Sequence, residues 1–339
     1  MNSILITGGL GYIGSHTAVE LINNGYDVII VDNLFNSVLK TIDRIKKITG
    51  KEPTFYEIDV CNKVELGNVF KQHPEISSVI HFAAYKAVGE SVAKPLEYYK
   101  NNVMGLINLL ECMEKANCSN LVFSSSCTVY GQPDVLPVTE ETPRKQAASP
   151  YGNTKKICED VIYDFIISGA NIKAISLRYF NPVGAHPSAL LGELPQGIPN
   201  NLMPLVTQTA LGQREKLLVY GNDYNTKDGT AIRDYIHVTD LANAHIKALD
   251  ELFKQNNCFY DTFNVGTGTG NTVLEVIESM NKNLEKPLAY EIVARRPGDV
   301  EKIYANSDKA NRVLNWQPIY SLDDMTKTSL EWEKNLSKD

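Results

Sequence analysis

Short apolar runs alternate with amphipathic stretches through the first half of the chain. The runs are rich in β-branched and aromatic residues, which favour strands. We predict strands at 3–7, 27–32, 53–59, 78–83, 120–126 and 172–180. The stretches between them place apolar residues on a helical period, which predicts helices after Gly14 and at 38–49, 62–72 and 95–116. Strands alternating with helices are typical of an α/β fold with a parallel sheet.

Another predicted helix begins at Ser149, because Ser is a good N-cap and Pro150 suits the first helical position. Gly169 should end it. The stretch 181–204 is rich in Pro and Gly and weakly periodic, so we interpret it as a long connection that shapes a site. Further elements follow near 202–212, 217–221, 232–238, 239–254, 262–266 and 272–282, before a helical C-terminal part. These patterns predict two domains, 1–180 and 181–339, with the chain crossing back to the first.

Composition narrows the class of protein. The 339 residues are 43% hydrophobic and 22% charged, as in an ordinary globular protein, and the net charge of −7 argues against nucleic acid or an anionic membrane as the main partner. The six cysteines form no C-x-x-C pair, which indicates reduced thiols. There is no apolar run of 18 residues, and the apolar start is too short for a signal peptide. We therefore expect a cytoplasmic protein, and we predict no metal site.

A glycine-rich loop follows the first predicted strand. Gly9, Gly11 and Gly14 form G-x-G-x-x-G, with Gly8 just before them, and Asp32 ends the next strand. This context is the dinucleotide fingerprint, in which the glycines let a pyrophosphate approach a helix N-terminus. An aspartate at this position accepts hydrogen bonds from the ribose hydroxyls and repels a 2′-phosphate. The loop therefore predicts a Rossmann-type, doubly wound domain that binds NAD rather than NADP.

Residues at the ends of later strands would complete this cofactor site. Asp59 ends the third strand, where it would meet the adenine. Ala83 and Ala84 follow the fourth strand and are small enough for the backbone to approach the cofactor, and Lys86 would reach a phosphate or ribose. Spacing alone does not assign these roles, since each residue would also suit a purely structural position.

Ser126, Tyr151 and Lys155 form the candidate catalytic set. Ser126 ends the fifth predicted strand, at the edge where parallel sheets bind ligands, and the other two begin the following helix. A free tyrosine titrates near ~10, so a base that acts at neutral pH needs a pKa lowered by about three units, or roughly 4 kcal/mol. A nearby lysine and a positive nicotinamide ring would favour the phenolate. The set predicts oxidation of an alcohol whose hydroxyl Ser126 orients.

The sequence resembles the extended short-chain dehydrogenase/reductase family, and within it the family of UDP-glucose (UDP-galactose) 4-epimerases. The superfamily shares the glycine loop and Tyr-x-x-x-Lys. The narrower resemblance rests on matching stretches spread over essentially the whole chain, among them RYFNPVGAHPS, GIPNNLMP and DGTAIRDYIHV.

The resemblance implies site residues by position. The catalytic set is again Ser126, Tyr151 and Lys155. The implied cofactor residues are Gly8, Gly11, Tyr12, Ile13, Gly14, Asp32, Asn33, Asp59, Val60, Phe82, Ala83, Ala84, Lys86, Asn101, Tyr151, Lys155 and Tyr179. The implied substrate residues are Lys86, Ser126, Tyr151, Phe180, Asn181, Asn201, Leu202, Tyr220, Arg233, Arg296, Asp299 and Ile303. The two arginines suit a pyrophosphate because their forked donors match its oxygens.

The implied reaction is reversible epimerisation of UDP-galactose and UDP-glucose at C4, through a transient 4-keto sugar and with tightly bound NAD. The family also implies a homodimer formed through the helices near 92–118 and 151–169. A sheet-packing helix would show the same apolar stripe, so the pattern alone does not decide the oligomeric state.

Other functions remain open at this point. Dehydratases of the same family carry Thr-Asp-Glu before Val-Tyr-Gly, whereas here Ser126, Cys127 and Thr128 precede it, so the acid needed for elimination is missing. A non-catalytic NAD sensor would not need the intact catalytic set, and a net dehydrogenase would release NADH. Family members that exclude N-acetylated sugars have Tyr at the position of Ile303. Since Ile is of intermediate size, a UDP-N-acetylglucosamine 4-epimerase or a dual-specificity enzyme is the nearest alternative.

Overall fold

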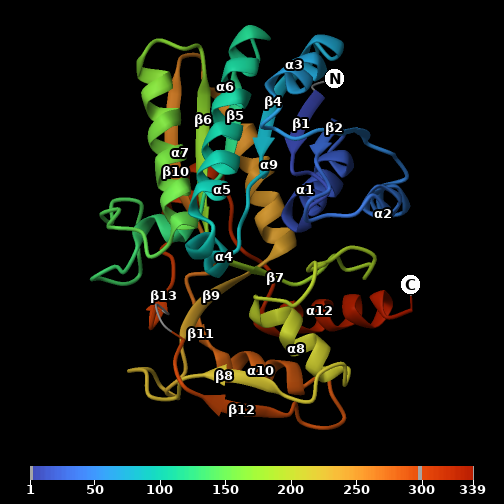
Figure 1. The fold of residues 1–339 in the computed structure, drawn as a ribbon, viewed down its shortest axis with the longest axis vertical. Coiled ribbons are helices and arrows are strands. Elements are labelled where there is room, and N and C mark those ends of the chain that lie inside the picture. The colour runs from blue at the N-terminus through green and yellow to red at the C-terminus, as the bar shows by residue number, and fades with distance from the viewer. Residues whose placement is uncertain (1–2, 297–299, 339) are drawn as a thin grey trace.

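The protein, described from a computed structural model, contains a large parallel sheet (Figure 1). The described residues are 3–296 and 300–338, so the predicted substrate residue Asp299 lies outside them. The seven strands have the order β10-β6-β5-β4-β1-β2-β3. In chain order they are β1 (Ser3–Thr7), β2 (Asp27–Asp32), β3 (Thr54–Glu57), β4 (Ile76–His81), β5 (Asn120–Ser124), β6 (Lys173–Tyr179) and β10 (Phe259–Val265).

Two hydrophobic cores cover the two faces of this sheet. Ile4 and Ile6 of β1 face one core, which they share with α1 (Tyr12–Asn23), α2 (Lys40–Thr49), α9 (Val238–Lys254) and α11 (Asp308–Leu314). Leu5 faces the other, with α3 (Lys63–Gln72), α6 (Gly105–Lys115) and α7 (Pro150–Ile167). Neighbouring strand residues thus point to opposite faces, and both faces are apolar because helices bury them. This arrangement confirms the predicted Rossmann-type α/β fold.

The chain reverses its winding between β1 and β4. From β1 it runs outward through β2 and β3, and from β4 it runs the other way through β5 and β6. The carboxyl ends of β1 and β4 therefore flank a crevice, which is where open α/β sheets bind their ligands.

The later part of the chain builds two small sheets below the large one (Figure 1). β7 (Asn181–Val183), β9 (Ile232–His237), β11 (Gly270–Thr272) and β13 (Lys302–Ile303) form one, and β8 (Leu217–Tyr220) pairs with β12 (Tyr290–Val293) in the other. A third core joins them to α8 (Leu202–Ala210), α10 (Val273–Asn281) and α12 (Leu322–Leu336). Residues after 181 also supply β10, α9 and α11 to the layers of the large sheet.

The predicted single helix over 95–116 is wrong in its detail. The segment divides into α5 (Pro95–Tyr98), a π-helical turn (Tyr99–Met104) and α6, and a short helix α4 (Val88–Ala93) precedes it. In the π-helical turn, Asn102 points inward, where its Oδ1 accepts from Tyr85 N at 2.8 Å and its Nδ2 donates to Thr154 Oγ1 at 2.9 Å. These tertiary hydrogen bonds compensate for the locally widened helix, and the periodicity of the segment does not reveal them.

The predicted start of α7 is confirmed. Ser149 is the N-cap and its side chain accepts from Gly152 N at 3.2 Å, with Pro150 in the first turn. At the other end, Gly169 has a φ of 101°, a left-handed conformation that suits glycine and ends the helix. This local geometry places Tyr151 and Lys155 on the first turns of a well-anchored helix.

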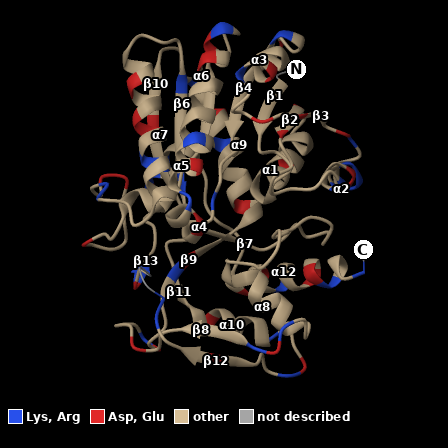
Figure 2. Ribbon diagram, viewed as in Figure 1, with Lys and Arg blue, Asp and Glu red and all other residues tan. Residues whose placement is uncertain are grey.

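No helix within residues 3–296 and 300–338 is long and apolar enough to cross a membrane. Basic and acidic segments are interspersed along the ribbon in Figure 2 rather than gathered by sign.

Candidate active site

The glycine loop crosses the carboxyl end of β1 and is tightly packed. Gly8 has a φ of 70°, and a Cβ there would lie 2.7 Å from Ala83 N. A Cβ on Gly14 would lie 2.3 Å from Gly8 O. Side chains are therefore excluded at both positions, and the loop passes close to the backbone that follows β4.

The loop leads into α1 without a side-chain cap. Gly11 is the N-cap residue, and no side chain accepts from the first turn of the helix. Free backbone N–H groups at a helix N-terminus favour an anion such as a pyrophosphate. The crowded glycines and the uncapped helix fit a dinucleotide, as the sequence predicts.

Asp32, the last residue of β2, lies beside this loop and is 6% exposed. Its Oδ2 accepts from Leu10 N at 3.0 Å, and its Oδ1 accepts from Leu34 N and Ser37 Oγ at 2.9 and 2.7 Å. The carboxylate thus ties the glycine loop to the end of β2. It lies where the fingerprint expects the group that binds the ribose.

Other predicted cofactor residues lie at the ends of the neighbouring strands. Asn33 Nδ2 donates to Asp59 Oδ2 at 3.2 Å, so the ends of β2 and β3 meet. Phe82 N and Ala83 N both donate to Thr7 O, at 2.9 and 3.1 Å, which brings the end of β4 against β1. The remaining members lie near these contacts with different degrees of burial: Val60 and Asn101 are buried, Ile13 and Ala84 are partly exposed, and Lys86 is exposed.

The predicted catalytic residues meet beyond the end of β5. Ser126 caps the 3₁₀ turn Cys127–Tyr130, and its Oγ accepts from Thr128 N at 3.2 Å and from Thr128 Oγ1 at 3.0 Å. Tyr151 lies close enough to Ser126 for the serine hydroxyl to lower the pKa of its phenol. Thr128 was missed in the sequence analysis, although a Ser N-cap two residues earlier is a recognisable signal.

A second hydrogen-bonded chain holds Lys155 and Tyr179. Lys155 Nζ donates to Ser124 O at 2.6 Å, and Ser124 Oγ and Tyr179 Oη share a hydrogen bond of 2.5 Å. The Lys155 ammonium also lies 4.9 Å from the centre of the Phe123 ring. The last residues of β5 and β6 are therefore fixed relative to the first turns of α7.

Burial dominates the electrostatics of these groups. It raises the pKa of Tyr151, the nearby Tyr179 adds to the rise, and the Ser126 hydroxyl partly opposes it. This direction is opposite to the lowered pKa expected from sequence, because Tyr151 is 9% exposed and a phenolate there would lose its hydration. Burial also lowers the pKa of Lys155 to about 8.

His81 is a further group that the sequence analysis did not single out. It ends β4, it is buried, and its Nδ1 lies 2.7 Å from Thr7 Oγ1. Burial and the charge of Lys155 lower its pKa to about 3. The neutral ring helps to hold the ends of β1 and β4 together, and the period of an apolar strand gives no signal for such a contact.

Several predicted substrate residues lie on the elements below the large sheet, among them Asn181, Arg233 and Ile303. The Arg296 guanidinium lies 4.5 Å from the centre of the Tyr220 ring. Arg233 and Ile303 are register partners in the parallel pair β9–β13, and Asn181 begins β7, which also pairs in parallel with β9, with Asn181 opposite Tyr235. Three segments distant in sequence therefore contribute to one small sheet.

Ile303 belongs to a fourth, smaller hydrophobic cluster beside Ser126. It is 6% exposed and shares this cluster with Cys127 and Phe180. Burial raises the pKa of Cys127 to about 12, although the charge of Arg233 opposes the rise. The cluster links the region around Ser126 to the small sheet, and its cysteine is a packed thiol rather than a nucleophile.

Asn201 and Leu202 lie at the start of α8. Asn201 is its N-cap and Leu202 its first residue, packed against the third core. Asn201 Nδ2 donates to Glu193 Oε1 at 2.7 Å, and the same oxygen accepts from Lys86 Nζ at 3.4 Å. Glu193 therefore joins two predicted site residues, although no sequence motif marked it.

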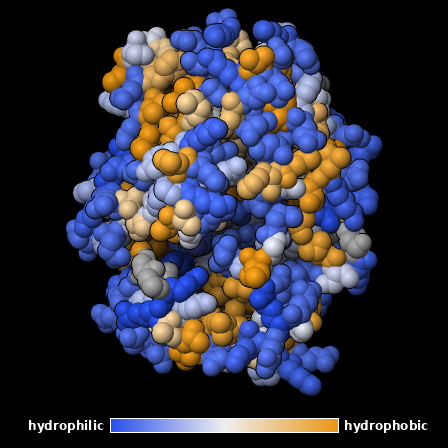
Figure 3. Space-filling model, in the orientation of Figure 1, coloured by the Kyte–Doolittle hydropathy of each residue, from blue (hydrophilic) through white to orange (hydrophobic). Residues whose placement is uncertain are grey.

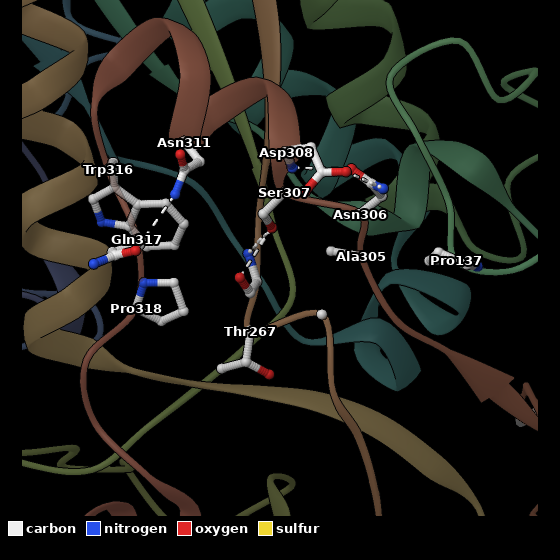
Figure 4. Close-up of a pocket in the computed structure, with 12 residues that line it drawn as sticks. Pro137, Thr267, Ala305, Asn306, Ser307, Asp308, Asn311, Trp316, Gln317 and Pro318 are labelled. Carbon is white, nitrogen blue, oxygen red and sulfur yellow. Dashed lines mark hydrogen bonds between the residues drawn. The ribbon is translucent and has the colours of Figure 1, made fainter.

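A cavity of about 310 Å³ lies apart from this crevice. It is bounded by the loop after β10 and by residues around the start and end of α11 (Figure 4). Thr267, Ser307 and Pro318 are among its lining residues, and none of the predicted site residues lines it. The candidate site is thus the crevice at the strand ends rather than this cavity.

Comparison with known proteins gives matches over nearly the whole chain. A family model described as GDP-mannose 4,6 dehydratase matches residues 5–329. The UDP-glucose 4-epimerase of Bacillus subtilis is 50% identical over 333 residues, which are 98% of this chain and 97% of the relative. The chain belongs to the UDP-glucose 4-epimerase family.

Solved structures agree with this family assignment. The UDP-glucose 4-epimerase from Stenotrophomonas maltophila, with bound NAD and formylated UDP-arabinopyranose, has a TM-score of 0.96 at 43% identity, over 100% of this chain and 99% of that one. The Bifidobacterium longum enzyme, in complex with NAD+ and UDP, has a TM-score of 0.94 at 46% identity, over 98% of both chains. The family resemblance predicted from sequence is confirmed, and the dehydratase named by the family model is a member of the wider group.

Proposed function

We propose that this protein interconverts UDP-glucose and UDP-galactose by inverting C4 of the hexose, with NAD bound in the crevice between β1 and β4. The observation that carries the proposal is the meeting of Ser126 and Tyr151 beside Tyr179, in a chain that matches epimerases from end to end. The alternatives are not favoured: relatives named UDP-glucose 4-epimerase match nearly full length, and Ser126, Tyr151 and Lys155 are all present.

NAD, when bound, accepts a hydride from the sugar carbon and returns it. The chain supplies the rest of the chemistry. The glycine loop and the start of α1 would hold the pyrophosphate, and Asp32 would bind the ribose. Because the hydride is returned, the reaction needs no second redox substrate.

The proposed role of Tyr151 is to take the proton from the 4-hydroxyl and to give it back. Ser126 orients that hydroxyl, and its own position is fixed by Thr128 at 3.0 Å. Lys155 is held by Ser124 O, and its ammonium stabilises the phenolate once the positive nicotinamide lies nearby. Since burial raises the pKa of Tyr151, these two positive charges must offset desolvation.

The nucleotide would be anchored by residues of the small sheets and helices below the large sheet. Arg233 and Arg296 suit the pyrophosphate, while Asn181 and Asn201 offer amide groups. An anchor away from the reacting carbon lets the sugar turn and present its other face. In this proposal residues 1–180, joined by the returning β10, form the NAD domain, and most of 181–339 forms the UDP-sugar domain.

We further propose that the protein is a cytoplasmic homodimer. Exposed apolar side chains gather over α4 to α7 (Figure 3), and they include Val92, Leu96, Met104, Tyr163 and Ile167. Leu96 is 81% exposed, which is unusual for a large apolar residue among helices that already cover a sheet. A second copy that covers this surface would remove it from water.

The direct test is to incubate the purified protein with UDP-galactose and no added nicotinamide nucleotide. We expect UDP-glucose to form until equilibrium is reached, and denaturation to release NAD. A folded protein that contains NAD but forms no UDP-glucose would contradict the proposed function.

A further inference from the structure

Glu193 contacts residues from both halves of the proposed site. Its Oε1 accepts from Asn201 Nδ2 at 2.7 Å and from Lys86 Nζ at 3.4 Å. Lys86 follows β4 of the large sheet, whereas Asn201 caps α8 among the lower elements. The charge of Glu193 also reaches Tyr12, at the start of α1, where it adds to the effect of burial in raising the pKa of that phenol. One carboxylate thus connects the cofactor crevice to the substrate region.

The fold fixes Glu193 through its backbone. Trp332 Nε1 donates to Glu193 O at 2.8 Å, and a Cβ on the preceding Gly192 would lie 2.4 Å from the Trp332 ring. Tyr12 Oη donates to Gly184 O at 2.6 Å, which ties the beginning of the same segment to α1. The long connection is therefore held between α1 and α12.

Glu193 is the better-fixed member of its ion pair. Its side chain is 11% exposed, whereas that of Lys86 is 48% exposed. A long, exposed lysine loses much rotamer freedom when it is held, so a carboxylate with little exposure can determine where its ammonium lies. Glu193, on the connection 181–204, therefore determines the position of the Lys86 side chain rather than the reverse.

The contacts also determine what the two partners offer a ligand. An ammonium has three donors, so two remain on Lys86 after one meets Glu193. The Asn201 amide donates to a carboxylate, which accepts only, so its Oδ1 must point away from Glu193 as an acceptor. The carboxylate also balances part of the lysine charge before a diphosphate arrives.

We propose that Glu193 is a positioning residue that orients Lys86 and Asn201 for the nucleotide sugar, an inference that rests on the function proposed above. It does not touch the reacting carbon. Its loss therefore affects binding of the sugar nucleotide more than the chemical step.

The test compares Glu193→Gln and Glu193→Ala with wild type as NAD-containing enzymes. The glutamine variant keeps an acceptor for Asn201 but loses the charge that holds Lys86, so we expect a KM for UDP-galactose raised about three- to tenfold and kcat within about twofold. The alanine variant loses both contacts and should raise KM more than tenfold. Glu285→Gln removes an exposed carboxylate outside the site and is the matched control.

A double-mutant cycle separates positioning from a general structural effect. Glu193→Gln combined with Lys86→Met should bind no worse than Lys86→Met alone, because the partner of the charge is already gone. Additive losses in this cycle, or a wild-type KM in Glu193→Ala, would overturn the proposal. Thermal melting shows whether each variant folds. If Glu193→Ala does not fold, the comparison of Glu193→Gln with wild type remains as the test.

A negative result for the positioning role of Glu193 can be told apart from a negative result for the proposed epimerase function. If the wild-type protein binds UDP but does not turn over UDP-galactose, the epimerase proposal fails on its own. Calorimetry with UDP on the same variants then tests Glu193 independently. Equal affinities for wild type and Glu193→Ala would reject the positioning role in that case.

Discussion

Tyr151 is held in a setting that opposes its ionisation, so its reactivity depends on its neighbours. Burial raises its pKa, and the Ser126 hydroxyl only partly reverses this. In the proposed mechanism the tyrosine hydroxyl is the group that exchanges a proton with the sugar. The structure also accounts for its fixed position, since α7 begins with a capped turn at Ser149.

We expect Tyr151→Phe to keep its NAD and to lose turnover by about 10²- to 10⁴-fold, the usual contribution of a positioned acid or base. The ring still fills its buried space, so the melting temperature should change little. Steady-state kinetics and NAD content after denaturation measure the two effects. Turnover within a few-fold of wild type would remove Tyr151 from the mechanism.

At the scale of elements, the site depends on how closely β1, α1 and β4 approach one another. Gly14 lies in the first turn of α1, where a Cβ would come within 2.3 Å of Gly8 O and 2.9 Å of Gly9 Cα. Both atoms belong to the backbone, so neither can move aside as a flexible side chain would.

Gly14→Ala should therefore destabilise the protein by about 1–3 kcal/mol and lower its NAD content. Gly89→Ala is the matched control, because Gly89 also lies in a helix, α4, but a Cβ there has no atom within 4 Å. That change should be neutral or slightly stabilising, since Ala favours a helix over Gly. Urea unfolding of both variants provides the comparison, and equal stabilities would contradict the packing argument.

The connection 181–204 contains structure and contacts that its sequence did not predict. Its Pro and Gly content predicted a segment that shapes a site, and the structure places β7 and Glu193 within it. Besides Asn201, Glu193 contacts Lys86 and Trp332, each more than a hundred residues away. Periodicity and spacing carry no information about such distant partners.

At the scale of the whole molecule, buried histidines link stability to pH. Burial lowers the pKa of His16 and His81 to about 3 and that of His237 and His245 to about 4. An unfolded histidine titrates near ~6.5, so between about pH 6.5 and 4 the unfolded chain binds more protons than the folded protein. Each such histidine makes stability fall by about 1.4 kcal/mol per pH unit as the pH falls, and Asp240, whose pKa burial raises to about 6, offsets part of this fall.

We expect urea midpoints to decrease steadily from pH 7 to 4.5. The His245→Gln variant should show a shallower decrease, because one of the histidines that contribute to the slope of stability against pH is gone. The variant has its own cost of substitution, so the slope against pH is the quantity to compare. A slope equal to that of wild type would show that His245 does not contribute to the pH dependence.

The proposed dimer is also a property of the whole molecule. Leu96→Asp combined with Met104→Asp should shift the protein toward monomer, because two charges would be buried in the interface. Ile319→Asp changes an apolar residue that is 73% exposed outside α4 to α7 and should leave the mass unchanged. Sedimentation velocity measures the oligomeric state of each variant. A wild-type protein that is monomeric at all concentrations would contradict the dimer.

The sequence by itself determined the features that local physics encodes. Period-2 and period-3.6 patterns placed the strands and most helices, Ser149 and Gly169 set the ends of α7, and the glycine loop with Asp32 indicated the cofactor site. These signals are readable because strands, caps and tight turns depend on residues close together in the chain. The tertiary structure decided the π-helical turn around Asn102, which strand returns to the large sheet, namely β10, and the contacts of Glu193. It also gave the raised pKa of Tyr151, since burial depends on what the rest of the chain packs around a side chain.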